Sequence, residues 1–412
     1  MINLALLRED TRRIRDIIVR KDPSFDVDGL IKADAENRNL VQKLEQLRAE
    51  KNDLAEQAKK GLTDQIRQRS IEIGKQIKEQ EALHDEVAKR LRDLHLSCPN
   101  LLSDDVQNGN KESNKAIKII GEKPHFNFDP KNHLELVKNL NWIDFESAAR
   151  MSASQFALYR GDCVRLMCAL EMFMLNNNMQ HGYEPVRPPL LINEKSLEGA
   201  SNFPRFKEDV FAVEKDGLYL TPTSEVNLAN LYRDVIFSEQ ELPIRMTALT
   251  SCFRREAGGY GATERGMIRM HQFEKVEIFS ITVPEESSHE HERMLACAES
   301  ILHKLGLHYR VSLLAAQDCS FASTKTYDIE IWMPGQKEYK EVSSVSNCTD
   351  FQSRRCAMRY RKGAGLKTEL VHTLNGSSLA LPRLMIALIE SGQRADGSIE
   401  FPDVLKSVCI GV

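Results

Sequence analysis

The chain has 412 residues, 42% of them hydrophobic, and its 56 basic and 60 acidic side chains give a formal net charge of −4. This length predicts two or three domains with a substantial core, and the charge excludes a protein that is basic over its whole surface, so a nucleic acid would have to bind a local patch. The nine cysteines are odd in number and contain no CxxC pair, which argues against a disulfide framework and a zinc site and favours the cytoplasm. No stretch is long and apolar enough to cross a bilayer, which argues against a membrane protein.

A helical hairpin is the first large element that the sequence predicts. Residues 1–20 predict a short amphipathic helix that ends at Asp22-Pro23. Two apolar seams follow, whose steps alternate between three and four residues, as in a heptad repeat. The seams are Leu30, Ala33, Asn37, Leu40, Leu44, Leu47, Lys51, Leu54 and Ala58, then Ile66, Ser70, Ile73, Ile77, Gln80, His84, Val87, Leu91 and Leu94. A turn at 61–64 joins them, so the helices should fold back as an antiparallel coiled-coil hairpin roughly 45 Å long.

The residues alone leave the role of this hairpin open. A heptad seam by itself indicates a structural coiled coil, such as a dimerisation element. A run of basic residues near the turn is either an ordinary solvated face or a stripe that follows the phosphates of a nucleic acid. The candidates for phosphate contact are Lys59, Lys60, Arg67 and Arg69.

A polar stretch rich in Asn, Asp, Ser and Lys divides the chain after the hairpin. We therefore predict a helical domain at 1–105, a linker at 106–120 and a second domain at 121–412. In the second domain the patterns predict helices at 149–179, 285–305 and 379–390, and strands at 268–281, 327–333 and 340–345. Strands interleaved with helices indicate an α+β fold.

The most specific chemical signal is a string of arginines around a glycine-rich loop. The sequence has no GxxxxGK[ST] phosphate loop, so a nucleotide would have to be held by side chains. Residues 252–261 read CFRREAGGYG and residues 265–277 read RGMIRMHQFEKVE, which predicts a strand, a loop and a returning strand. A guanidinium can donate two hydrogen bonds to a phosphate, and Phe273 offers a face for a base. A single arginine is more often part of a surface salt bridge, but the whole string is far more specific.

This string resembles motif 2 of the class II aminoacyl-tRNA synthetases in its seryl form. Residues 182–189 (GYEPVRPP) resemble motif 1, residues 221–225 (TPTSE) the amino-acid-binding Thr-x-Glu, residues 341–355 a stretch typical of the seryl enzymes, and residues 375–383 (NGSSLALPR) motif 3. The hairpin is similar to the tRNA-binding arm of these enzymes. The resemblance covers nearly the whole chain and implies a catalytic domain built on a mainly antiparallel β-sheet flanked by helices.

The resemblance implies an enzyme that activates L-serine with ATP and transfers serine to the 3′ end of serine tRNA, with selenocysteine tRNA as a further acceptor. It also implies a homodimer built through motif 1, and tRNA contacts from the basic residues of the hairpin. The other readings are a relative that loads an amino acid onto a carrier protein, a non-catalytic relative and a structural coiled coil. The first lacks the arm and the third leaves the chain after residue 120 unexplained. The second should lack Arg254, Glu277 or Arg383, and all three are present.

The resemblance also assigns the nucleotide site. It implies that Arg254 holds the α-phosphate and Arg383 the γ-phosphate, the two catalytic positions, because neutralising charge on the transferring group is the main device of phosphate chemistry. Glu256 would recognise the adenine amino group, Phe273 would stack on the ring, and Glu341 with Ser344 would contact Mg²⁺ carried by ATP. From the residues alone the last pair could equally be an exposed strand end. The full implied ATP set is Arg254, Arg255, Glu256, Phe273, Glu341, Val342, Ser343, Ser344 and Arg383.

The implied serine site is built around carboxylates, because a buried ammonium needs an opposite charge. The set is Thr223, Ser224, Glu225, Glu277 and Ser377. Glu277 alternates with Val276 and Ile278, which fits a solvent-facing strand position equally well. The sequence departs from the bacterial pattern at Ser378 and Pro382, where glycine is usual, so the loop geometry there should differ.

Overall fold

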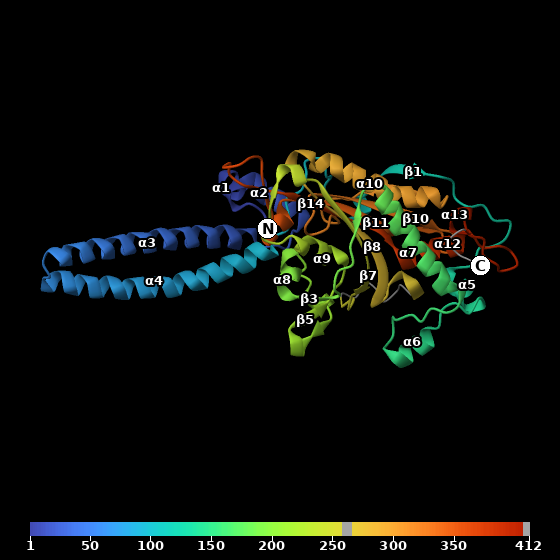
Figure 1. Cartoon of the computed structure of the whole chain (residues 1–412), viewed down its shortest axis with the longest axis horizontal. Coiled ribbons are helices and arrows are strands. Elements are labelled where there is room, and N and C mark those ends of the chain that lie inside the picture. Colours follow the sequence, from blue (N-terminus) through green and yellow to red (C-terminus); the bar gives the residue numbers. More distant parts are fainter. Residues whose placement is uncertain (258–265, 407–412) are drawn as a thin grey trace. The chain divides into compact units, whose positions relative to one another are not determined.

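The computed structural model describes residues 1–257 and 266–406 (Figure 1). These residues form two compact units, Ile2–Pro99 and the chain from Asn100 onward. No helix within the two described ranges is long and apolar enough to cross a membrane.

The N-terminal unit consists of helices α1 (Leu4–Glu9), α2 (Thr11–Lys21), α3 (Val27–Lys60) and α4 (Asp64–Ser97). α3 and α4 pack along each other as the expected antiparallel hairpin (Figure 1). Leu44, Leu47, Ile73 and Ile77 of the two predicted seams are buried between them. Thr63 starts α4 by accepting a hydrogen bond from the Ile66 amide at 3.3 Å. The heptad prediction is therefore confirmed.

The single helix expected at 1–20 is wrong, because two helices occupy this stretch. Asp10 lies between α1 and α2, and its carboxylate accepts a hydrogen bond from the Arg13 amide at 3.1 Å. An aspartate that caps a new helix in this way satisfies one of its open N–H groups and favours a break over a continuous helix.

The second unit is built on an eight-stranded sheet with the strand order β1-β9-β10-β11-β14-β8-β7-β2. The strands are β1 (Lys115–Ile120), β9 (Tyr309–Leu313), β10 (Lys325–Met333), β11 (Glu338–Thr349), β14 (His372–Ala380), β8 (Gln272–Thr282), β7 (Ile244–Phe253) and β2 (Glu184–Pro185). All neighbours are antiparallel except the pair β2 and β7. The expected mainly antiparallel sheet is therefore confirmed.

Helices and two small sheets surround this large sheet. α10 (Ser287–Lys304) packs on β14 and β11, and α12 (Leu381–Ser391) packs on β8 and β10. The remaining helices are α5 (His133–Asn139), α6 (Phe145–Met151), α7 (Asp162–Gln180), α8 (Glu194–Gly199), α9 (Ser224–Leu231), α11 (Phe351–Cys356) and α13 (Asp403–Lys406). The small sheets are formed by β3 (Leu191–Asn193), β5 (Leu218–Leu220) and β4 (Ala212–Val213), and by β13 (Glu369–Leu370), β12 (Arg359–Arg361) and β6 (Ile236–Ser238).

Two boundaries differ from the sequence prediction. The long helix expected at 149–179 is divided into α6 and α7, and α7 begins after Gly161, whose φ of 55° suits glycine far better than other residues. The expected linker at 106–120 is too long, because 115–120 form the edge strand β1 paired with β9. Asn100 already belongs to the second unit, where its side-chain amide donates to the carbonyl oxygens of Ala322 and Cys348 at 2.8 and 2.9 Å.

Candidate active site

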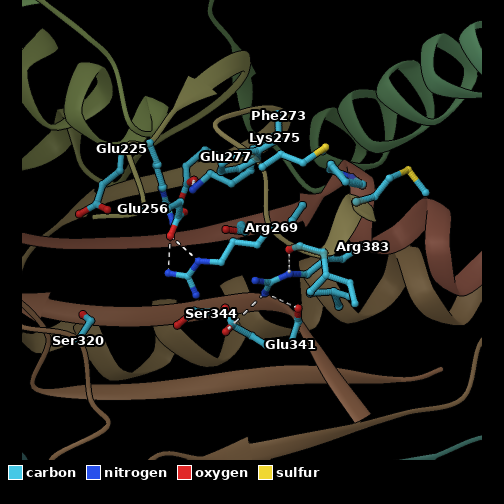
Figure 2. A pocket seen from close by; sticks show the side chains of 18 of the residues that line it. Glu225, Glu256, Arg269, Phe273, Lys275, Glu277, Ser320, Glu341, Ser344 and Arg383 are labelled. Carbon is cyan, nitrogen blue, oxygen red and sulfur yellow. Dashed lines mark hydrogen bonds and ion pairs between the residues drawn. The ribbon is translucent and has the colours of Figure 1, made fainter. Parts of the chain in front are cut away.

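A pocket of about 430 Å³ lies over the middle of the large sheet, where β8, β14 and β11 run side by side (Figure 2). The expected site residues that line it are Glu225, Arg254, Glu256, Phe273, Glu277, Glu341, Val342, Ser344, Ser377 and Arg383. Residues expected to bind ATP and residues expected to bind serine therefore share one cavity.

Strand β8 contributes every second side chain to the pocket. Phe273, Lys275 and Glu277 line it, as the two-residue period of a strand requires. Val276 and Ile278 point away and are fully buried in the core. Glu277 is only 2% exposed, which excludes the solvent-facing reading of this position.

Strand β11 breaks the same alternation with a β-bulge. Ser343 pairs with Ile329 of β10 and Glu341 pairs with Glu330, so Val342 is an extra residue without a partner position. Glu341 and Ser344 are three residues apart and would face opposite sides of a regular strand. The bulge brings both to the pocket, together with Val342.

The carboxylate of Glu277 is held by a buried network at one end of the pocket. Its Oε2 pairs with Lys275 Nζ and accepts a hydrogen bond from Thr223 Oγ1 at 3.2 Å. Lys275 Nζ also donates to Thr223 Oγ1 at 2.8 Å. Ser377 lies directly opposite Glu277 across the pair β14 and β8, so the hydroxyl-bearing strand position and the carboxylate are neighbours.

Glu225 adds a second carboxylate at this end. Burial and, after it, the negative charge of Glu277 raise its pKa, Lys275, Gln352 and Arg254 lower it, and the pKa that results is about 7. Gln352 Nε2 donates to Glu225 Oε1 at 2.7 Å. Two carboxylates around one lysine form a site that a further cation would stabilise.

Guanidinium groups and an aromatic ring line the rest of the pocket. The Arg254 guanidinium carbon lies 5.4 Å from the centre of the Phe273 ring. Arg269 forms an ion pair with Glu256 through Oε2, so Oε1 of Glu256 can accept from an amino group. Arg383 Nη1 donates to the Glu341 carbonyl at 2.7 Å and lies 3.6 Å from its Oε2. Figure 2 shows Arg383 and Glu225 at opposite ends of the cavity.

Four expected residues lie beside the pocket and do not line it. Thr223 caps α9 and contacts Glu277 and Lys275 from behind. Ser224 is buried, and its hydroxyl has no hydrogen-bond partner in the described ranges. The Arg255 guanidinium lies 5.7 Å from the Phe211 ring centre. Ser343 Oγ donates to the Ser377 carbonyl at 2.5 Å. Residues 258–261 and 265 of the motif 2 string lie outside the described residues.

The two departures in motif 3 have structural explanations. Ser378 is buried, and its hydroxyl donates to Asn178 Oδ1 of α7 at 2.8 Å. Pro382 stands in the first turn of α12, where no backbone N–H is needed for helix hydrogen bonds. Ser378 and Pro382 are therefore compatible with the connection from β14 to α12 that brings Arg383 to the pocket.

Three residues that bind the expected carboxylates Glu277, Glu256 and Glu225 were given no role in the sequence analysis. Lys275 and Arg269 belong to the motif 2 string, and their spacing from Glu277 and from Phe273 could have marked them as pocket-facing. Gln352 carried no such signal, because it lies 127 residues from its partner Glu225.

Magnesium fits this site only together with a nucleotide. No cluster of three or more His, Cys, Asp and Glu side chains in the described part of the chain could hold a metal ion. Glu341 and Ser344 offer oxygen ligands from one face of β11. One or two protein oxygens completed by phosphates and water are a usual arrangement for Mg²⁺.

The basic candidates of the hairpin differ in their surroundings. Lys59 pairs with Glu56 at 2.5 Å, and Arg69 pairs with Glu50 and Glu72 at 2.8 and 3.1 Å. Lys60 and Arg67 are exposed on either side of the turn.

Comparison with known proteins relates both units to one family. Residues 1–102 match the seryl-tRNA synthetase N-terminal domain, and residues 208–392 match the tRNA synthetase class II core domain (G, H, P, S and T). A serine–tRNA ligase from Staphylococcus haemolyticus is 42% identical over 413 residues, 98% of this chain and 96% of that protein. One from Akkermansia muciniphila is 44% identical over 416 residues, with 98% and 97% covered. The solved seryl-tRNA synthetase from Pyrococcus horikoshii, complexed with ATP, has a TM-score of 0.93 and 33% identity, with 99% of this chain and 98% of that chain covered.

Proposed function

The chain belongs to the seryl-tRNA synthetases, the class II serine–tRNA ligases, and we propose that the pocket over β8, β14 and β11 is where it joins serine to ATP. One observation carries this proposal: the cavity has the carboxylates of the half-buried Glu225 and the buried Glu277 toward one end, Arg383 at the other end and Arg269 between them (Figure 2). An amino acid brings an ammonium and a nucleotide brings phosphates, so the two substrates need opposite charges.

ATP takes the part of the pocket lined by arginine and phenylalanine. The adenine stacks on Phe273 and its amino group donates to Glu256, while Arg254 and Arg383 bind the α- and γ-phosphates. The P. horikoshii relative was solved with ATP, and the arginines here line a cavity able to hold such a ligand. Glu341 and Ser344 would hold the Mg²⁺ carried by ATP, whose positive charge would neutralise the phosphates.

Serine takes the opposite end. Its ammonium lies between Glu225 and Glu277, and its hydroxyl contacts the polar groups around Ser377. Thr223 positions Glu277 through the 3.2 Å hydrogen bond and does not itself need to touch serine. A site that hydrogen-bonds a substrate hydroxyl rejects alanine strongly, because its own polar groups are left without partners.

In the first step, the serine carboxylate attacks the α-phosphorus of ATP, the bond to the bridging oxygen breaks, and pyrophosphate leaves. Arg254 neutralises the negative charge that builds on the α-phosphoryl oxygens, and Arg383 holds the leaving pyrophosphate. In the second step, the terminal ribose hydroxyl of tRNA attacks the seryl carbonyl carbon. The ester forms, the bond between the carbonyl carbon and the phosphate oxygen breaks, and AMP leaves with the hydroxyl proton.

We also infer a homodimer through motif 1 at residues 182–189 and through α7, the helix that directly precedes it. Val164, Met172 and Met179 are 43%, 50% and 49% exposed, and Cys168 between them is exposed too. Their steps of four, four and seven residues place them on one face of the helix. An exposed apolar stripe of this kind supports burial against a second copy.

We further infer that the hairpin binds serine tRNA, with Lys60 and Arg67 as its more available phosphate contacts. Selenocysteine tRNA is a second acceptor in this proposal. The eight cysteines in the described ranges are thiols, seven of them buried, which supports the cytoplasm as the compartment.

A pyrophosphate exchange panel tests the central proposal. Exchange should require serine, with little activity for alanine or threonine. Exchange with a different amino acid and none with serine would contradict the assignment of this pocket.

A further inference from the structure

A cationic and aromatic surface lies at the edge of the active site. We call it the rim cluster and define it as Arg205, Phe206 and Phe321. The Phe206 and Phe321 rings meet edge to face with centres 6.3 Å apart. The Arg205 guanidinium carbon lies 5.2 Å from the Phe321 ring centre and 6.0 Å from that of Phe206. Phe206 is 38% exposed and Arg205 is exposed, while Phe321 is half-buried.

Buried groups beneath the rim cluster hold it in place. The Phe321 ring packs edge to face on the fully buried Phe351, with centres 5.6 Å apart. Arg355 lies over both rings, and its Nη1 donates to the carbonyl oxygens of Glu198 and Phe203 at 3.0 and 3.1 Å. The Asn100 amide donates to the Phe321 carbonyl at 3.0 Å. Phe321 is therefore held by buried contacts, and the exposed Phe206 ring packs against it.

The rim cluster adjoins the serine end of the pocket. Ser320, which precedes Phe321, lines the cavity, and Figure 2 shows it on the side of Glu225, away from Arg383. The chain provides a second link, because Gln352 binds Glu225 and its neighbour Phe351 supports Phe321. The rim cluster is therefore one residue away from the wall of the cavity, at the end where serine is proposed to bind.

The chemistry of the rim cluster fits single-stranded nucleic acid. Aromatic faces stack on bases of any sequence, and an adjacent arginine binds the backbone phosphate. ATP and serine are accommodated within the pocket, so neither needs an aromatic surface outside it. Resting on the proposed function, we propose that Arg205, Phe206 and Phe321 bind the unpaired 3′ segment of tRNA and direct its terminal ribose to the seryl-adenylate.

The test separates the two steps of the reaction. Phe206→Ala should leave serine-dependent pyrophosphate exchange unchanged. In single turnover it should slow transfer from preformed seryl-adenylate to tRNA by about tenfold at subsaturating tRNA, the loss expected for one stacked base. Phe206→Tyr should restore transfer, because the ring is kept. Arg205→Ala should also reduce transfer, and its effect should shrink at high salt.

Phe126→Ala is a matched control. Its ring pairs with Phe128 at 5.3 Å, and neither residue lines the pocket. A direct readout is a serine tRNA carrying the fluorescent base pyrrolocytosine in its unpaired 3′ segment. Binding to the wild type should quench its fluorescence by stacking, and binding to Phe206→Ala should quench it less.

Each result decides one question. Normal exchange and normal transfer in Phe206→Ala, or unchanged quenching, would overturn the rim assignment and leave the proposed function intact. A purely structural stack would give this result, or would lower exchange and transfer together. Absence of serine-dependent exchange in the wild type would contradict the proposed function itself.

Discussion

Serine binding should depend on pH through Glu225, and Glu225→Gln should remove that dependence. Burial, assisted by the charge of Glu277, raises the pKa of Glu225 to about 7. The ammonium of serine favours the ionised carboxylate, so serine and a proton compete for this group. The charged groups around it are Glu277, Lys275 and Arg254.

The size of the effect follows from the pKa. A carboxyl group with a pKa near 7 is ionised to about one-tenth at about pH 6 and to about nine-tenths at about pH 8. Since only the ionised form pairs with the ammonium, the KM for serine should fall about tenfold as the pH rises across this interval. A carboxylate with an ordinary pKa would give no change there.

The assay is pyrophosphate exchange at saturating ATP over this pH range, with calorimetric titration of serine in two buffers of different ionisation enthalpy. Near neutral pH the wild type should release a fraction of a proton on binding serine. Glu225→Gln should show a raised and pH-independent KM. Glu274→Gln is the matched control, because the pKa of Glu274 on β8 is also raised by burial, but Glu274 does not line the pocket. A flat wild-type profile, or a slope that survives in Glu225→Gln, would refute the reasoning.

Three other predictions concern the remaining parts of the proposal. Arg254→Ala should lower exchange about a thousandfold, since the charge on the transferring phosphoryl group is no longer neutralised. Arg255→Ala should change exchange little, because the Arg255 side chain lies over Phe211. Equal effects of the two substitutions would contradict the assignment of Arg254 to the α-phosphate. Excising the hairpin of α3 and α4 should preserve exchange and reduce tRNA charging by orders of magnitude, and normal charging without the hairpin would make it a structural element. Lys60→Ala and Arg67→Ala should each flatten the salt dependence of tRNA binding by roughly one unit of slope. Met172→Glu should place a charge on the exposed face of α7 and yield monomers by light scattering, and an unchanged mass would exclude this face as the dimer contact.

The regular parts of the fold were predictable because they depend on local periodicity. The seams with Leu44 and Ile73 require only a repeat of three and four residues, and the structure buries both. Failures occurred where one polar contact overrides the pattern. The hydrogen bond from the Arg13 amide to Asp10 divides one expected helix in two. Strand β1 was not foreseen for a different reason, because its partner β9 lies nearly two hundred residues later in the chain.

In the site as well, side-chain positions that depend on local periodicity were predictable, and contacts between distant segments were not. Alternation along β8 places Phe273 and Glu277 correctly once the strand is known. Sequence alone did not reveal that Thr223 acts through Glu277, since this depends on a hydrogen bond between two distant segments. Nor did it reveal that Arg69 is engaged by Glu50 of the facing helix, because that pairing depends on the relative register of α3 and α4.

Because of the bulge at Val342, the positions of β11 that tolerate substitution should not follow one continuous two-residue alternation. From Ser343 to Asn347 the even-numbered positions share the side of Ser344, whereas before the bulge Glu341 and Tyr339 take that side. A saturation scan along β11 should therefore show a phase slip of one residue at this point. Counting by twos from Ser344 toward the start of the strand would select Lys340 as a pocket neighbour and miss Glu341.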